Sequence, residues 1–125
     1  MSKHIPLILV AAILSVTGEI ALKIAMNRFG TLSVSPKDLP QTVWNLMTNP
    51  LVLLALFLYV IAVFFWIAAL SRMDLNFAYP VFTALGYIMA TIASRLILSE
   101  PLPPSRLTGI AIICVGLLVI WRYAD

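Results

Sequence analysis

The sequence predicts an all-α membrane protein, a single domain of residues 1–125 that crosses the bilayer four times. Hydrophobic residues make up 62% of the 125 residues and only 10% are charged, a balance that ordinary soluble domains do not have. Four apolar stretches approach or exceed the ~20 helical residues that a bilayer requires. We expect these spans at residues 5–26, 50–70, 77–98 and 107–121.

The first span and the loop after it carry clear local signals. Residues 5–26 are too long for a signal peptide, contain Glu19 and Lys23, and lack a small-residue cleavage site. In the loop after this span, Asn49 and Pro50 have the pattern of an N-cap and a first-turn proline, which predicts the start of the second span. Apolar residues at helical spacing also predict a short interfacial helix within this loop. They are Leu39, Val43, Leu46 and Met47.

The other two connections are short. Residues 71–76 predict a tight antiparallel turn, and Pro80 is expected in the first turn of the third span, where its missing N–H costs little. Residues 100–105 contain three prolines, which should end one helix before the next begins. The fourth span has only 15 residues, so we expect Arg106 and Arg122 to extend it by reaching to the interface.

Glu19 and Lys23 are ionisable residues inside the first span. A carboxylate four residues before an ammonium lies on the same helix face, in the order that favours an ion pair. At 1.5 Å per residue, Glu19 lies ~5 Å beyond the middle of the span and Lys23 ~11 Å beyond it, so Lys23 can extend to the membrane surface. Charged groups at this depth face a protein interior or water and are functional candidates by default. A pair that only locks two helices together is the alternative.

Further polar residues extend this candidate site. Ser15 shares a helical stripe with Glu19 and Lys23. The first and third spans run in the same direction, so Arg95 emerges on the side of the membrane where Lys23 does. A polar stripe with basic residues around its mouth suits an anionic headgroup, although each basic residue alone is equally consistent with an interfacial anchor. Other basic residues expected on this side are Arg28, Lys37 and Arg106.

The reactive residue types argue against catalysis. His4 is the single histidine and lies at the N-terminus, and Cys114 is the single cysteine and lies within an apolar span. No nucleophile–base spacing, metal-ligand cluster or glycine-rich phosphate motif is present in the sequence. We therefore expect no enzyme and no cofactor, and the net charge of +3 does not indicate a nucleic-acid partner. Transport through a polar site between helices remains.

Small residues recur on two of the predicted helices at spacings that allow close helix approach. Gly86, Ala90 and Ser94 repeat every fourth residue, and Gly109 and Gly116 are separated by seven. Two such strips leave one for a partner subunit, so we expect a homodimer or a heterodimer with a similar subunit. Lysine and arginine are nearly balanced on the two sides, so the positive-inside rule does not set the orientation.

Three motifs in order along the chain resemble the drug/metabolite transporter (EamA-like) superfamily. They are residues 14–23, with the sequence LSVTGEIALK, then Ala78-Tyr79-Pro80, and Ser99-Glu100-Pro101. Four helices in about 125 residues match its smallest members. The chain is most similar to the Arn-type aminoarabinose-phosphoundecaprenol flippase subunits, which carry glutamine where this chain has Glu19. The resemblance implies flipping of a polyprenyl-phosphate-linked sugar, with an aminosugar as the expected case, across the bacterial inner membrane.

For such a cargo, four residues have expected roles. Lys23 and Arg95 would bind the lipid phosphate through charge-assisted hydrogen bonds. Glu19 would bind a sugar ammonium or sugar hydroxyls, and Tyr79 would add a hydroxyl or ring contact. The polyprenyl chain would stay in the bilayer.

Two alternatives remain open. The chain is also similar to the small multidrug resistance family, whose helix-one glutamate would fall at Ser15 and whose third-helix tryptophan is replaced by Phe82. Under that alternative, Glu19 would exchange protons for small or quaternary cations. The other alternative is a non-transporting partner of a membrane glycosyltransferase.

Overall fold

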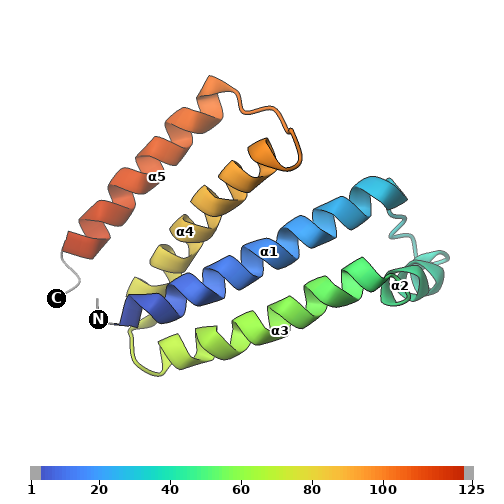
Figure 1. Cartoon of the computed structure of the whole chain (residues 1–125), viewed down its shortest axis with the longest axis horizontal. Coiled ribbons are helices and arrows are strands. Elements are labelled where there is room, and N and C mark those ends of the chain that lie inside the picture. Colours follow the sequence, from blue (N-terminus) through green and yellow to red (C-terminus); the bar gives the residue numbers. More distant parts are fainter. Residues whose placement is uncertain (1–3, 123–125) are drawn as a thin grey trace.

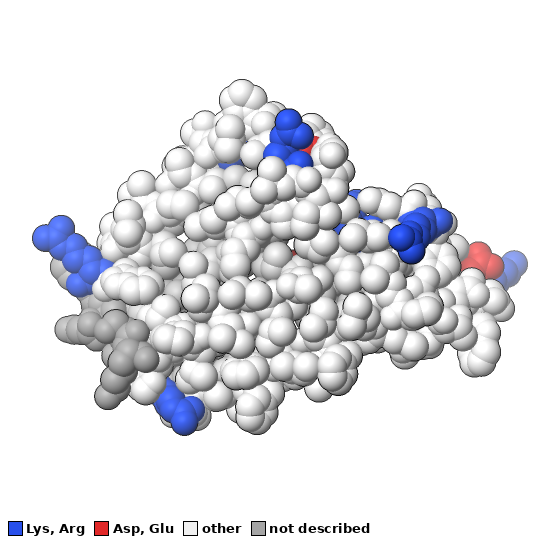
Figure 2. Space-filling model, viewed as in Figure 1, with Lys and Arg blue, Asp and Glu red and all other residues white. Residues whose placement is uncertain are grey.

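The computed structural model describes residues 4–122, which contain five helices and no strand (Figure 1). All but the second helix are long and apolar enough to cross a membrane, so the predicted all-α, four-span architecture is confirmed. The protein is therefore a multi-pass membrane protein. In the view of Figure 2, lysine and arginine side chains lie toward the edges of the molecule, and a broad uncharged surface separates them. The helices are α1 (Ile5–Phe29), α2 (Leu39–Met47), α3 (Pro50–Leu70), α4 (Leu75–Leu96) and α5 (Pro104–Arg122).

Local signals before α3 behave as predicted. The Asn49 side chain caps α3, because its Oδ1 accepts hydrogen bonds from the backbone N–H groups of Leu51 at 2.9 Å and Val52 at 3.2 Å. Pro50 occupies the first helical position, where a missing N–H breaks no helical hydrogen bond. The predicted short helix in the first loop is also present, as α2.

Two helix starts differ from the prediction. α5 begins at Pro104, because a proline fits the first turn of a helix as well as it ends the preceding one, and the fourth span therefore has 19 residues instead of 15. α4 begins at Leu75, directly after the extended Asp74. Pro80 consequently lies inside α4 and not in its first turn. The hydrogen bond that an N–H at this position would donate to the Asn76 carbonyl is missing.

α1 packs against both α3 and α4 (Figure 1). Gly18 allows close approach to α3, since a Cβ atom at this position would lie 3.2 Å from the Ala55 carbonyl oxygen and 3.5 Å from the Tyr59 ring. A cluster of buried hydrophobic residues lies near the two described ends of the chain. It contains Ile8, Ala69, Met73, Phe77, Ala78 and Val81.

The predicted small-residue strips do not pack closely within the chain. A Cβ atom added to Gly86, Gly109 or Gly116 would meet nothing within 4 Å. α5 contacts α4, but none of the described α5 residues is buried. The close helix contact therefore occurs at Gly18, on a helix for which no strip was predicted. The partner subunit remains a prediction.

Candidate functional site

A cavity of about 270 Å³ lies between α1 and α4, and it brings together two of the predicted site residues. Ser15 and Glu19 lie four residues apart on α1, so they occupy the same helix face and both line the cavity. The opposite wall is α4, and it is lined partly by the small residues Gly86 and Ala90. The remaining lining residues are Ala12, Val16, Phe82, Thr83 and Tyr87.

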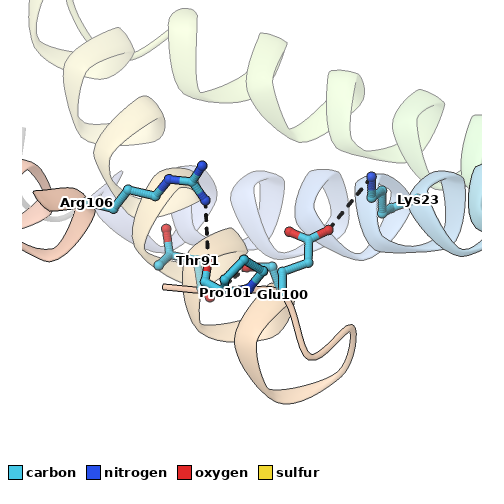
Figure 3. Close-up of polar contacts among 6 residues, drawn as sticks. Lys23, Thr91, Glu100, Pro101 and Arg106 are labelled. Carbon is cyan, nitrogen blue, oxygen red and sulfur yellow. Dashed lines mark hydrogen bonds and ion pairs between the residues drawn. The ribbon is translucent and has the colours of Figure 1, made fainter. Parts of the chain in front are cut away.

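The predicted ion pair between Glu19 and Lys23 is wrong. The Lys23 Nζ atom instead lies 3.8 Å from Oε1 of Glu100, in the loop between α4 and α5 (Figure 3). The cause is depth. A flexible lysine reaches toward the membrane surface, where the loop lies, because its ammonium loses less hydration there than beside a carboxylate one turn deeper. Within residues 4–122, Glu19 has no ion-pair partner.

Polar residues gather beyond this ion pair, at the junction of α4 and α5. A cavity of about 200 Å³ is lined there by Thr91, Ser94, Glu100 and Arg106, among others. Arg106 makes one long hydrogen bond, from Nη1 to the Pro101 carbonyl at 3.4 Å (Figure 3). Arg106 was predicted on this side of the membrane, whereas the position of Glu100 between Arg106 and Lys23 was not predicted (Figure 3).

Four hydroxyl groups connect the cavities along α4, and we call them the hydroxyl ladder: Tyr79, Thr83, Tyr87 and Thr91. Tyr79, Thr83 and Tyr87 line a cavity of about 310 Å³ between α4 and α5. Thr83 and Tyr87 also line the α1–α4 cavity, and Tyr87 and Thr91 line the α4–α5 junction. Of the ladder residues, Tyr79 alone was among the predicted site residues. The regular four-residue spacing of the ladder was the signal that would have shown it.

Besides Lys23, two further predicted site residues, Tyr79 and Arg95, lie outside the α1–α4 cavity. Tyr79 is near the start of α4 and packs edge-on against Trp66, with ring centroids 6.4 Å apart. It lines the cavity at the α3–α4 turn, together with Asp74. Arg95 is exposed and lines neither the α1–α4 cavity nor the α4–α5 junction. It lies one helical turn beyond Thr91 on α4.

Metal chemistry has no evident site in this arrangement. Across residues 4–122, no group of three or more histidine, cysteine, aspartate or glutamate side chains is placed to hold a metal ion. The cavities instead offer separate carboxylates, hydroxyls and basic groups, which bind ligands by ion pairing and hydrogen bonding.

This chain is similar in sequence to a known protein family. The sequence model of the family described as Small Multidrug Resistance protein matches residues 45–113, which is more than half of the chain. The chain belongs to this family. The matched region extends from α2 into α5, so it includes the hydroxyl ladder and Arg106 and excludes α1 with Glu19.

Curated relatives extend the similarity to the rest of the chain. A probable 4-amino-4-deoxy-L-arabinose-phosphoundecaprenol flippase subunit ArnE from Pseudomonas aeruginosa strain UCBPP-PA14 is 24% identical over 119 residues, covering 94% of this chain and 96% of the relative. A probable flippase subunit ArnE of Pseudomonas savastanoi pv. phaseolicola is 37% identical over 59 residues, 47% of this chain and 51% of the relative. The chain thus spans about half the length of that relative.

The chain is also similar to a relative named as the other flippase subunit, ArnF. The probable flippase subunit ArnF of Sodalis glossinidius is 41% identical over 76 residues, which are 58% of each chain. No solved structure gives a significant match. The predicted similarity to Arn-type subunits and to small multidrug resistance proteins is confirmed.

Proposed function

We propose that this protein is a subunit of a dimeric flippase that moves a polyprenyl-phosphate-linked aminosugar across the bacterial inner membrane, and that it is a transporter and not an enzyme. The observation that carries the proposal is the α1–α4 cavity, in which Glu19 faces space at membrane depth without an ion-pair partner in the described chain. Relatives named as flippase subunits for such a lipid support it, since one alignment covers 94% of the chain and so includes α1.

The cargo has two charges of opposite sign, and the site has a group for each. The sugar ammonium would bind the Glu19 carboxylate, and Ser15, one turn away on α1, would bind a sugar hydroxyl. The lipid phosphate would bind Lys23, one turn closer to the membrane surface, through a charge-assisted hydrogen bond. The polyprenyl chain would remain between the helices and the surrounding lipid.

The hydroxyl ladder offers a path for the sugar. Its first and last members, Tyr79 and Thr91, are twelve residues apart on α4, which is ~18 Å of helix at 1.5 Å per residue. The hydroxyls of Tyr79, Thr83 and Tyr87 make no hydrogen bond within the described part of the chain, so they are available to a sugar that moves past them. A path of this kind replaces part of the water that the headgroup loses in hydrocarbon.

A second subunit would complete the site. Glu19 is exposed in the single chain although it lies at membrane depth, and α5 has no buried residue among those described. A carboxylate facing lipid is costly. A partner that covers the open side of the α1–α4 cavity removes this cost, and both a second copy and a similar subunit would serve.

Family membership favours a second candidate, a proton-coupled exporter of small or quaternary cations that uses Glu19. One proteoliposome experiment compares the two. Flipping of labelled aminoarabinose-phosphoundecaprenol is measured beside proton-gradient-driven uptake of a quaternary ammonium probe. We expect flipping without cation uptake, in vesicles containing the chain alone or with a similar subunit. Cation uptake without lipid flipping would replace the proposal by the second candidate.

A further inference from the structure

Glu100 lies near two basic residues, because its carboxylate pairs with Lys23 and the residue also lines a cavity with Arg106. Its Oε1 atom is 3.8 Å from the Lys23 ammonium, and its side chain lines the same 200 Å³ cavity as Arg106. Thr91 and Ser94 add hydroxyl oxygens to that cavity. Lysine and arginine together with hydroxyls are groups that bind phosphate.

The backbone holds Glu100 in this position. Ser99 has a φ of 55°, in the left-handed region that non-glycine residues rarely adopt, and it turns the chain sharply after α4. The Glu100 N–H then donates a hydrogen bond to the Ser94 carbonyl at 3.2 Å, which fixes the loop to α4. Prolines at 101, 103 and 104 stiffen the rest of the loop up to the start of α5. The carboxylate is therefore presented to Lys23 by a defined turn.

The contacts of this carboxylate are weak for a structural ion pair. The Lys23 and Glu100 side chains are 51% and 37% exposed, and exposed pairs at such a distance contribute little to stability. Arg106 forms one long hydrogen bond to a carbonyl and no ion pair within the described chain. It also lies in the first turn of α5, at the positive end of that helix dipole. The basic groups thus remain able to accept a stronger anion.

We infer that Glu100 is a built-in competitor that occupies the phosphate site of Lys23 and Arg106, and that the cargo phosphate binds by displacing it. The inference rests on the proposed lipid-phosphate cargo and adds Arg106 and Glu100 to its site. Displacement leaves Glu100 free to return when the phosphate departs. The carboxylate therefore lowers affinity on this side of the membrane and favours release of the headgroup.

The test is equilibrium binding of decaprenyl phosphate to the purified full-length protein in detergent. Glu100→Gln keeps the shape and removes the competing charge, so it should bind about two- to fivefold more tightly than the unmodified protein, the effect of losing one exposed ion pair. Asp74→Asn is the matched control, because it removes an equal charge at the α3–α4 turn and should change nothing. Arg106→Gln should weaken binding at least threefold, whereas Arg95→Gln should not.

Unchanged or weaker binding by Glu100→Gln would overturn the inference, as would an equal gain in Asp74→Asn, which would indicate a general charge effect. Glu100→Ala provides a second variant if the amide prevents folding. Inorganic phosphate is titrated in parallel, and a Glu100→Gln effect confined to it would assign the site to a free anion and overturn the lipid assignment. Since decaprenyl phosphate carries no sugar, these results do not depend on whether an aminosugar lipid is flipped.

Discussion

Replacing Lys23 by methionine separates a structural role of this lysine from a role in binding the cargo phosphate. Methionine keeps an unbranched apolar stem and removes the ammonium. The ammonium lies 3.8 Å from the Glu100 carboxylate, and both side chains are more than a third exposed. An ion pair of this kind is worth about 0–1 kcal/mol. The unfolding free energy of Lys23→Met should therefore fall by less than about 1 kcal/mol.

The effect on the cargo should be larger. A hydrogen bond to a charged group contributes about 1.5–3 kcal/mol. Since each 1.4 kcal/mol corresponds to about tenfold in affinity, Lys23→Met should weaken binding of the lipid phosphate by about 10- to 150-fold. Flipping at lipid concentrations below saturation should fall by a similar factor in a protein that remains folded.

The assay pairs flipping of labelled aminoarabinose-phosphoundecaprenol in proteoliposomes with unfolding in detergent. Lys23→Arg is the control, because it retains a cation that binds phosphate, and it should keep most of the flipping activity. Flipping at the unmodified rate by Lys23→Met would refute the phosphate role. A loss of flipping that tracks a large loss of stability would show that the lysine acts by holding the α4–α5 loop to α1.

The cavities and the helix packing lead to three further predictions. Glu19→Gln should retain substantial lipid flipping, because an amide still accepts hydrogen bonds from an ammonium, but it should abolish any proton-driven uptake of a quaternary cation. If Glu19→Gln lost all flipping and the unmodified protein took up the quaternary cation, the exporter would be favoured. Gly18→Val should lower the unfolding free energy in detergent by about 1–3 kcal/mol through overpacking against α3, while Gly86→Val, with open space at its Cβ, should lower it much less; equal losses would contradict the α1–α3 contact. Tyr87→Phe should slow flipping several-fold by removing a ladder hydroxyl, and an equal effect of Tyr59→Phe would contradict the proposed path.

The sequence predicts those parts of the fold that depend on neighbouring residues. Hydropathy locates the four spans, and the Asn49 cap is readable because its partners are two and three residues away. The start of α5 was misplaced because Pro104 fits a helix start and a helix end equally well. The start of α4 was predicted two residues late, because the change from polar to apolar residues occurs both at Leu75 and at Phe77. Pro80 was therefore expected in the first turn of the helix, whereas it lies inside the helix.

The candidate site was predictable only in part, because some of its contacts join residues that are far apart in the sequence. Ser15 and Glu19 share one helix face, and their cavity results from that face meeting α4. The partner of Lys23 could not be predicted, since Glu100 belongs to a loop that only the tertiary fold brings to α1. Side-chain reach then decided between a nearby deep carboxylate and a distant shallow one, and spacing along the sequence does not show which loop lies beside Lys23.

Both candidate functions use Glu19, but they differ in whether they need the basic residues Lys23 and Arg106. Glu19 has no counter-ion within the described residues, so an ammonium, a quaternary cation or a proton would each satisfy it. The basic groups distinguish the two candidate functions. Lys23 and Arg106 lie close to the α4–α5 loop, and a purely cationic cargo would meet repulsion there that Glu100 only partly offsets. A cargo with both a phosphate and an ammonium uses both regions at once, which is why the charge pattern favours the aminosugar lipid.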